Sequence, residues 1–332
     1  MENRNLGNSG LKVPVLSLGT ATFAGSTELF RKWGQTDVPE ASRMIDISLE
    51  HGLNFFDTAN VYSTGGAETV LGKALKGRRY QALISTKATF AMGEGANDKG
   101  SSRYHLMKSL DDSLRRLETD YVDLYFMHGF DSSTPIEETL STLDMMVKSG
   151  KVRYIGASNF TAWQLMKSLS VSEKNAWEKY IVYQGYYSLV GRDYEQELMT
   201  LMQDQRVGLM VWSPLGWGRL TGKIKRNGMI GEGRIKSGGG EGGPTIPDDY
   251  LYNVIDCLED IAGETRKTVP QVAINWLLHN KTVSNIVIGA RNEKQLIENI
   301  GATGWRLSQE HIEKLNAVSN IPLIYPHWVG DR

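Results

Sequence analysis

The chain has 332 residues, of which 37 are Lys or Arg and 38 are Asp or Glu, so its formal net charge at pH 7 is -1. This balance provides no basic surface for nucleic acid, and we expect no nucleic-acid partner. The single cysteine, Cys257, excludes an internal disulfide. No apolar run approaches the ~18 residues of a membrane helix, and the polar start has no signal-peptide core. We therefore expect a cytoplasmic protein without a membrane contact.

The first predicted element is a β-hairpin. Residues 4–18, RNLGNSGLKVPVLSL, place the turn-forming residues Asn8, Ser9 and Gly10 between two short segments of alternating character. The segments that follow predict a barrel, and we expect this hairpin to close its bottom.

Eight short segments rich in β-branched and aromatic residues follow, and helical patterns separate them. They are VLSLGT (15–20), NFFDTA (54–59), ALISTK (82–87), VDLYFMH (122–128), YIGASN (154–159), YIVYQG (180–185), GLMVWS (208–213) and SNIVIGA (284–290). Strand and helix in alternation predict parallel strands, and a closed barrel uses eight of them.

Two of the intervening helices have clear signatures. In residues 102–118 four leucines, at positions 106, 110, 114 and 117, form an apolar stripe suited to packing on a sheet. In residues 134–150 we expect Thr134 and Glu137 to form a capping box, with Pro135 at the first helical position and Gly150 at the end.

A doubly wound dinucleotide-binding sheet is the competing architecture. Such a sheet has G-x-G-x-x-G after its first strand, and residues 19–25, GTATFAG, do not match this pattern. We therefore predict a (β/α)8 TIM barrel that forms a single domain over residues 1–332. The glycine-rich stretch at 228–249, after the seventh strand, is expected to be a flexible loop, and surface loop and lid remain open as its role.

Polar residues stand where three of the predicted strands end. Asp57, Lys87 and His128 end the second, third and fourth strands, and Tyr62 follows Asp57 by five residues. Each has an ordinary structural explanation by itself, but all the carboxyl ends of barrel strands meet on one face. An ammonium lowers the pKa of a nearby phenol from its usual value of ~10, so Lys87 would make Tyr62 a proton donor, with Asp57 anchoring Lys87 and His128 binding the oxygen that receives the proton.

The later strand ends predict a ligand with several parts. Ser158, Asn159 and Gln184 suit a carboxamide group, Trp212 offers a surface for ring stacking, and residues 213–223, SPLGWGRLTGK, combine glycines with cations that suit a pyrophosphate. A nicotinamide dinucleotide satisfies this set. The six histidines are scattered without metal-ligand spacing, so we expect no metal.

These segments resemble the aldo-keto reductase superfamily over nearly the whole chain, in its NADPH-dependent bacterial-type aldehyde and ketone reductase branch. The resemblance rests on LGNSGLKVPVLSLGT, DTANVYSTGGAE, STK, MHGFD, KVRYIGASNF, SPLGWGRLTGK and GARNEKQLIENIGA, in this order. It implies a barrel that reduces aldehydes or ketones with NADPH, with Asp57, Tyr62, Lys87 and His128 as catalytic residues. His128 favours carbonyl reduction over the double-bond reduction of relatives that resemble this pattern but have Glu there.

The resemblance also implies the cofactor contacts. Arg291 is the expected partner of a 2′-phosphate, which favours NADPH over NADH. The full set of predicted contacts is Gly19, Thr20, Asp57, Ser158, Asn159, Gln184, Trp212, Ser213, Pro214, Leu215, Gly216, Gly218, Lys223, Gly289, Arg291, Gln295, Glu298 and Asn299.

A small carbonyl compound with an apolar or aromatic body is the expected substrate. Phe23, Trp33, Phe90 and Trp217 are the candidates for its pocket, although each has core packing as an alternative. The superfamily also includes the β subunits of voltage-gated potassium channels, so an NADPH-binding regulatory subunit is the alternative function. No long inactivation segment precedes RNLGNSGL in this sequence, so we expect the enzyme rather than the regulatory subunit. The sequence leaves the oligomeric state open.

Overall fold

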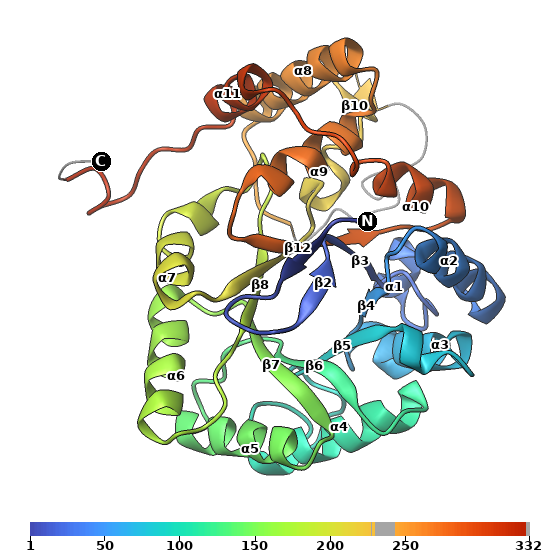
Figure 1. The fold of residues 1–332 in the computed structure, drawn as a ribbon, viewed down its shortest axis with the longest axis vertical. Helices are drawn as coiled ribbons and strands as arrows, with labels where there is room; N and C mark the ends of the chain where they lie inside the picture. Colours follow the sequence, from blue (N-terminus) through green and yellow to red (C-terminus); the bar gives the residue numbers. More distant parts are fainter. Residues whose placement is uncertain (227, 230–242, 330–332) are drawn as a thin grey trace.

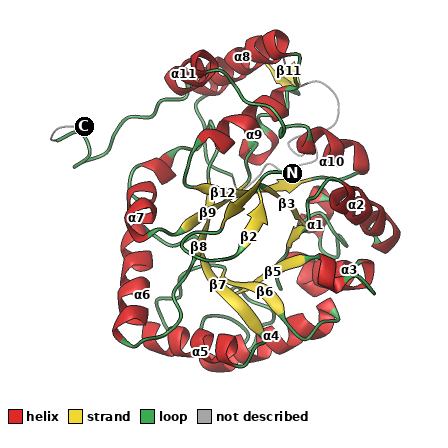
Figure 2. Cartoon of the chain, in the orientation of Figure 1, coloured by secondary structure: helices red, strands yellow, loops and turns green. Residues whose placement is uncertain are grey.

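The computed structural model describes residues 1–226, 228–229 and 243–329, and its centre is a closed barrel of parallel strands (Figures 1 and 2). In barrel order the strands are β12 (Val283–Gly289), β3 (Leu16–Gly19), β4 (Phe55–Asp57), β5 (Leu83–Ala88), β6 (Val122–Met127), β7 (Val152–Ser158), β8 (Val182–Tyr186) and β9 (Gly208–Trp212). Each predicted strand segment contains or overlaps one of them. The (β/α)8 barrel predicted from the sequence is confirmed.

Helices surround the barrel (Figure 2). They are α1 (Glu28–Trp33), α2 (Val38–Glu50), α3 (Gly66–Ala74), α4 (Arg103–Leu117), α5 (Ile136–Lys148), α6 (Ala162–Lys174), α7 (Leu198–Gln205), α8 (Asp248–Thr265), α9 (Val269–His279), α10 (Glu293–Ile300) and α11 (Gln309–Val318). The four leucines of the predicted stripe on α4 are buried, as their spacing predicts. None of the helices in the described part of the chain combines the length and apolar character that crossing a membrane requires.

The start of α5 differs from the prediction. Pro135 is its N-cap, and the side chain of Thr134 donates instead to Asp131 over 2.6 Å, so Thr134 and Glu137 form no capping box. Burial alone would raise the pKa of Asp131, but hydrogen bonds from its neighbours hold that pKa at about 2. The ionised carboxylate of Asp131 is a stronger hydrogen-bond acceptor for the Thr134 hydroxyl than a neutral oxygen would be. The helix ends before Gly150, whose φ of 78° reverses the chain.

The predicted hairpin is present and closes one end of the barrel. Strand β1 (Asn3–Asn5) pairs antiparallel with β2 (Lys12–Pro14). Leu6 and Val13, both fully buried, join a cluster with inward-facing residues of the barrel strands. Those partners are Phe55, Leu124, Phe126, Val182, Met210 and Val287. The hairpin therefore fills the end of the barrel opposite to the carboxyl ends of its strands.

A short antiparallel pair follows β9. It consists of β10 (Ile224–Lys225) and β11 (Gly228–Met229). Most of the loop predicted for 228–249 lies outside the described residues, and the chain is described again from Gly243 into α8.

Candidate active site

The carboxyl ends of β4 and β5 bring a buried ion pair together. The Lys87 ammonium donates to the Asp57 carboxylate over 2.6 Å and to the Thr58 carbonyl over 2.7 Å. Asp57 and Lys87 are 2% and 0% exposed. The parallel pairing of β4 with β5 sets this contact, because it aligns Asp57 with Ser85, two residues before Lys87. The contact between Asp57 and Lys87 that the sequence predicts is therefore present in the structure, as an ion pair.

Asp57 is the centre of a wider hydrogen-bond network. Its second carboxylate oxygen accepts from the Ser85 hydroxyl over 2.6 Å and from the Gln184 amide over 3.0 Å. A buried carboxylate is costly unless its oxygens are paired, and here both are. Asp57 is thus fixed by side chains from β5 and β8.

Lys87 remains charged in this environment. Burial disfavours the ammonium, but the carboxylate of Asp57 and the phenol of Tyr62 outweigh it, so the pKa of Lys87 is raised above its ordinary value. The ammonium lies 5.1 Å from the centroid of the Tyr62 ring. A fixed positive charge at this position stabilises negative charge that develops on the phenol oxygen.

Tyr62 opens a strained turn. In the short helical turn Tyr62–Gly65, the two residues after the tyrosine, Ser63 and Thr64, have φ values of 51° and 53°. Non-glycine residues adopt such values only where the surroundings impose them. The Ser26 hydroxyl donates to the Ser63 carbonyl over 2.5 Å, and the Ser63 hydroxyl donates to the Phe23 carbonyl over 2.9 Å. These bonds fasten the turn to the loop after β3.

A buried acid holds the same turn from the other side. Glu68 on α3 is fully buried, accepts from the Thr86 hydroxyl over 2.5 Å and pairs with Arg116 of α4 over 2.7 Å. The side chain of Arg116 in turn packs against Gly65, where a β-carbon would lie 2.7 Å from it. The turn that carries Tyr62 is therefore tied to β5, next to Lys87.

His128 follows β6 and is neutral. Burial, together with the charge of Lys87, lowers the pKa of its imidazole well below the ordinary value. Its main-chain N–H donates to the Ala88 carbonyl over 2.8 Å, and its own carbonyl accepts from the Asn159 amide over 2.8 Å. Its Nδ1 atom is buried without a hydrogen-bond partner in the described structure. The ring is thus placed by its backbone.

Aromatic rings form a continuous arc around Tyr62. Trp33 and Phe30 lie 5.2 Å apart between ring centroids, Phe30 and Tyr62 6.0 Å, Tyr62 and His128 5.8 Å, and His128 and Phe90 4.5 Å. This arc bounds a cavity of about 480 Å³, a volume typical of small-molecule sites. Of the predicted residues, the cavity is lined by Gly19, Trp33, Asp57, Tyr62, Phe90, His128, Ser158, Asn159, Gln184, Trp212, Ser213, Pro214, Trp217 and Gly289.

A second cavity of about 430 Å³ adjoins the first, and the two share Trp33, Ser213, Pro214 and Gly289 among others. The predicted residues that line it include Leu215, Gly218, Lys223, Arg291, Gln295, Glu298 and Asn299. The main-chain N–H of Arg291 donates to the Gln295 side chain over 2.9 Å, which fixes the start of the loop before α10. Together the two cavities make one elongated site with cations at the far end.

Three predicted site residues line neither cavity, namely the substrate-pocket candidate Phe23 and the cofactor-contact candidates Thr20 and Gly216. Phe23 is fully buried in the hydrophobic core, and its main-chain N–H donates to the Thr20 carbonyl over 2.9 Å. Thr20 is also buried and donates its hydroxyl to the Asp57 carbonyl over 3.2 Å. Gly216 packs against Val190, and it lines neither cavity, nor does Thr20.

Sequence reasoning named Trp33 of α1 for the pocket but missed other residues of the cavity wall. Leu29 and Phe30 of this helix line the first cavity, as do Thr22 and Val61. A six-residue helix gives almost no periodic signal, so only the folded chain reveals these contacts. Within the described residues no cluster of His, Cys, Asp and Glu has the arrangement of a metal site.

Comparisons with known proteins give the family. The aldo/keto reductase family model matches residues 15–320. The chain is 36% identical over 326 residues to a probable voltage-gated potassium channel subunit beta of Oryza sativa subsp. japonica, with 96% of each chain covered. It is 37% identical over 308 residues to a protein of the same description from Arabidopsis thaliana, with 91% of each chain covered.

A bacterial relative is the uncharacterized oxidoreductase YrpG of Bacillus subtilis (strain 168), 33% identical over 339 residues and 96% of each chain. Aldo/keto reductases generally use a nicotinamide cofactor. The closed barrel, the family match and this relative agree with one another. The chain therefore belongs to the aldo/keto reductase family, which supports an oxidoreductase activity for its barrel.

Proposed function

We propose that this protein reduces aldehydes or ketones to alcohols with NADPH, with Tyr62 as the general acid. The observation that carries the proposal is the buried Asp57–Lys87 pair, whose ammonium lies 5.1 Å from the Tyr62 ring at the edge of a cavity. A charged lysine beside a phenol has a chemical use, whereas a purely structural core gains little from a buried ion pair.

The residues present fit NADPH. Ser158 is 1% exposed and its hydroxyl lacks a hydrogen-bond partner among the described residues, yet Ser158 lines the first cavity beside Asn159 and Gln184. A buried polar atom of this kind is satisfied by a ligand amide. Lys223 and Arg291 line the second cavity, where phosphates would bind. When bound, NADPH supplies a hydride to the carbonyl carbon.

In this proposal each catalytic residue has a separate task. Tyr62 gives its phenol proton to the carbonyl oxygen, and Lys87 stabilises the phenolate that remains. Asp57 holds the ammonium in place through its 2.6 Å bond. His128, neutral because burial lowers its pKa, can donate one ring N–H to the carbonyl oxygen without carrying a competing positive charge. The aromatic arc excludes water from the reacting oxygen.

The test is reduction of 4-nitrobenzaldehyde followed by the loss of NADPH absorbance. We expect turnover in the wild-type protein and a fall of roughly 10²–10⁴-fold in Tyr62→Phe, because the proton donor is removed. NADPH binding, measured by quenching of tryptophan fluorescence, should be equal in both proteins. Wild-type turnover no higher than that of Tyr62→Phe would contradict the proposed enzyme.

A second function is favoured by the two plant relatives, which are named as probable potassium channel β subunits. In that function the barrel binds NADPH as a regulatory subunit. The two functions give different results in the same experiment: NADPH quenches tryptophan fluorescence in both, and only the reductase consumes NADPH when a carbonyl panel of methylglyoxal, aryl aldehydes and keto-sugars is supplied.

A further inference from the structure

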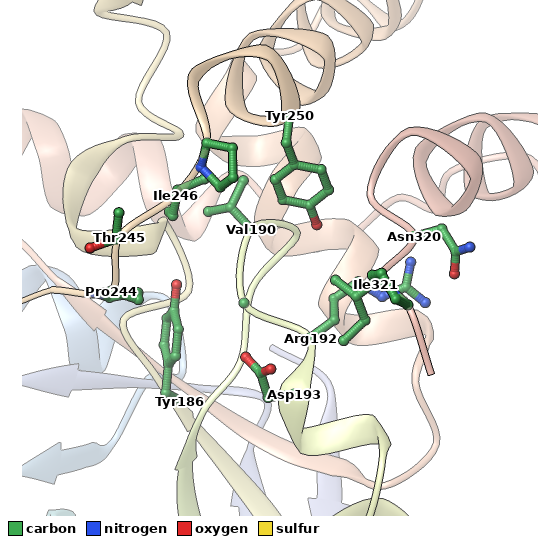
Figure 3. A pocket seen from close by; sticks show the side chains of 13 residues that line it. Tyr186, Val190, Arg192, Asp193, Pro244, Thr245, Ile246, Tyr250, Asn320 and Ile321 are labelled. Atoms are coloured by element: carbon green, nitrogen blue, oxygen red, sulfur yellow. The ribbon is translucent and has the colours of Figure 1, made fainter. Parts of the chain in front are cut away.

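The described residues also enclose a separate cavity of about 320 Å³ (Figure 3). Three segments far apart in the sequence form it: residues 186–193 after β8, residues 244–247 with Tyr250 at the start of α8, and residues 320–322 after α11. All the residues that line it are described. Its volume is within the range of small-molecule sites. No residue predicted for catalysis or cofactor binding lines it.

The walls of this cavity suit an apolar body next to a positive charge. The phenol rings of Tyr186 and Tyr250 face it from two sides, and Val190, Ile246 and Ile321 supply aliphatic surface (Figure 3). The Tyr250 hydroxyl is occupied, since it donates to the carbonyls of residues 189 and 319. The Tyr186 hydroxyl accepts a hydrogen bond from the Ser188 hydroxyl over 3.1 Å. Both side chains also present ring surface to a ligand, and organic cations are attracted to such rings.

The lining contains two charged residues, Arg192 and Asp193, and the Arg219 guanidinium donates to the carbonyl of the lining residue Pro244 over 3.3 Å. Asp193 is exposed, and its carboxylate has no hydrogen-bond or ion-pair partner among the described residues. The other charged residue of the lining, Arg192, is neutralised by a bidentate bond to Glu195, with two distances of 2.8 Å. The remaining donors of Arg192 reach the Asn316 carbonyl and the Ser319 hydroxyl. Asp193 is therefore the uncompensated charge of the lining.

Tyr186 connects this cavity to the candidate active site. Its ring centroid lies 5.3 Å from that of Trp212 and 5.2 Å from that of Trp217, and both tryptophans line the active-site cavity. Tyr186 and Trp212 are also paired in register on β8 and β9. A molecule bound against Tyr186 thus contacts a ring that packs on two aromatic residues of the active-site cavity.

We propose that this cavity is a binding site for a small organic ammonium compound with an apolar or aromatic body, and that its occupant acts on the active site through Tyr186, Trp212 and Trp217. The ammonium group pairs with Asp193 and contacts the tyrosine rings, while the apolar body packs between Val190 and Ile321. Any consequence for turnover rests on the proposed reductase function, whereas binding at the site does not.

The test compares three compounds of similar size on the full-length protein: 2-phenylethylammonium, 2-phenylethanol and 3-phenylpropionate. Binding is measured by titration calorimetry and by tryptophan fluorescence. We expect the cation to bind about fivefold more tightly than the alcohol, as one partly exposed ion pair allows, and the anion to bind least. Asp193→Asn should abolish the preference for the cation, and the fluorescence of the wild-type protein should change on binding because of the Tyr186 contact.

Two variants locate the site. Asp120→Asn is the matched control, because Asp120 is an exposed aspartate before β6, at the opposite end of the barrel, and it should leave the preference unchanged. Ile321→Trp fills the cavity, and it should weaken binding of both the cation and the alcohol while the circular dichroism spectrum stays that of a folded barrel. Equal binding of cation and anion, an equal effect of the two aspartate variants, or undiminished binding in Ile321→Trp would overturn the proposal.

Discussion

Arg291 is the residue on which cofactor choice depends in our proposal. It lines the far cavity with Lys223, and its guanidinium also donates to the Lys32 carbonyl over 2.8 Å, which holds the side chain beside α1. A guanidinium is planar and has several N–H donors, and a phosphate accepts two such donors at once.

We expect Arg291→Ala to weaken NADPH binding by roughly 10–100-fold, the value of a charge-assisted hydrogen bond, and to leave NADH binding nearly unchanged. The measurement is fluorescence quenching with each cofactor. Arg306→Ala is the control, because its guanidinium lies 3.3 Å from the Glu2 carboxylate and Arg306 lines neither cavity. Equal losses for NADPH and NADH would remove the phosphate contact.

His128 makes stability depend on pH. The pKa of His128 in the folded protein lies well below the ordinary value. In mildly acidic solution the unfolded chain therefore binds a proton at this residue and the folded chain does not. Stability from this residue is fully present above about pH 6.5 and is lost as pH falls below that value, by up to about 1.4 kcal/mol per pH unit.

Replacing His128 should therefore flatten the acid limb of the stability curve. We expect the decrease in unfolding free energy between pH 7 and pH 5, measured by urea titration, to be smaller in His128→Gln than in the wild type. His51→Gln, which changes an exposed histidine at the end of α2, should behave like the wild type. Identical pH curves for all three proteins would contradict the neutral His128.

At the scale of elements, the turn between β4 and α3 is held against its own backbone strain. Ser63 and Thr64 adopt left-handed φ values, and Glu68 ties the start of α3 to Thr86 and Arg116. Strain of this kind persists only where neighbouring elements impose it. The ties run to β5 and α4, so three elements together place the phenol of Tyr62.

We expect Glu68→Gln to lower the free energy of unfolding by about 3 kcal/mol, since it leaves Arg116 without its charged partner in a largely buried position. The turnover number should fall while the Michaelis constant for NADPH changes little, because Tyr62 and not the cofactor site is displaced. Asp111 lies on the same helix as Arg116 and forms an exposed ion pair with Lys151. Asp111→Asn breaks this pair and should lower the free energy of unfolding by less than about 1 kcal/mol. Unchanged turnover in Glu68→Gln would show that the turn holds its shape without this tie.

At the scale of the whole molecule, the hairpin residues that stabilise the barrel and the residues of the candidate active site lie at opposite ends of the barrel. The hairpin closes one end with Leu6 and Val13, and the candidate active site occupies the other. Residues at the hairpin end pack against Phe55, Leu124 and other interior residues, so they support the barrel without reaching the cavities. Substitutions at the two ends should therefore have different effects.

A matched pair of leucine substitutions tests this separation. Leu6→Ala should lower the free energy of unfolding by about 2–5 kcal/mol, the cost of a core cavity, and leave turnover per folded molecule unchanged. Leu29→Ala, at a half-exposed position on the cavity wall, should change stability little but raise the Michaelis constant of an apolar aldehyde. Denaturant titration and steady-state kinetics measure the two effects. A large kinetic defect in Leu6→Ala would contradict the separation.

The sequence alone determined the strands and the residues at their carboxyl ends. The eight mostly apolar segments, each of six or seven residues, have the composition of buried strands, which local sequence alone indicates. Parallel strands in a barrel then present Asp57, Lys87 and His128 on one face. The ion pair could be anticipated because a buried ammonium and a buried carboxylate each need a partner.

Only the tertiary structure decided which neighbours the chain brings to these ends. It turned Phe23 into the core, moved the Thr134 hydroxyl to Asp131, set Gln184 against Asp57 and placed Phe30 beside Tyr62. Each of these outcomes depends on contacts between segments that are distant in sequence or on a loop conformation that several contacts impose. Local periodicity contains no information about such contacts, because their energy exists only once the barrel has closed.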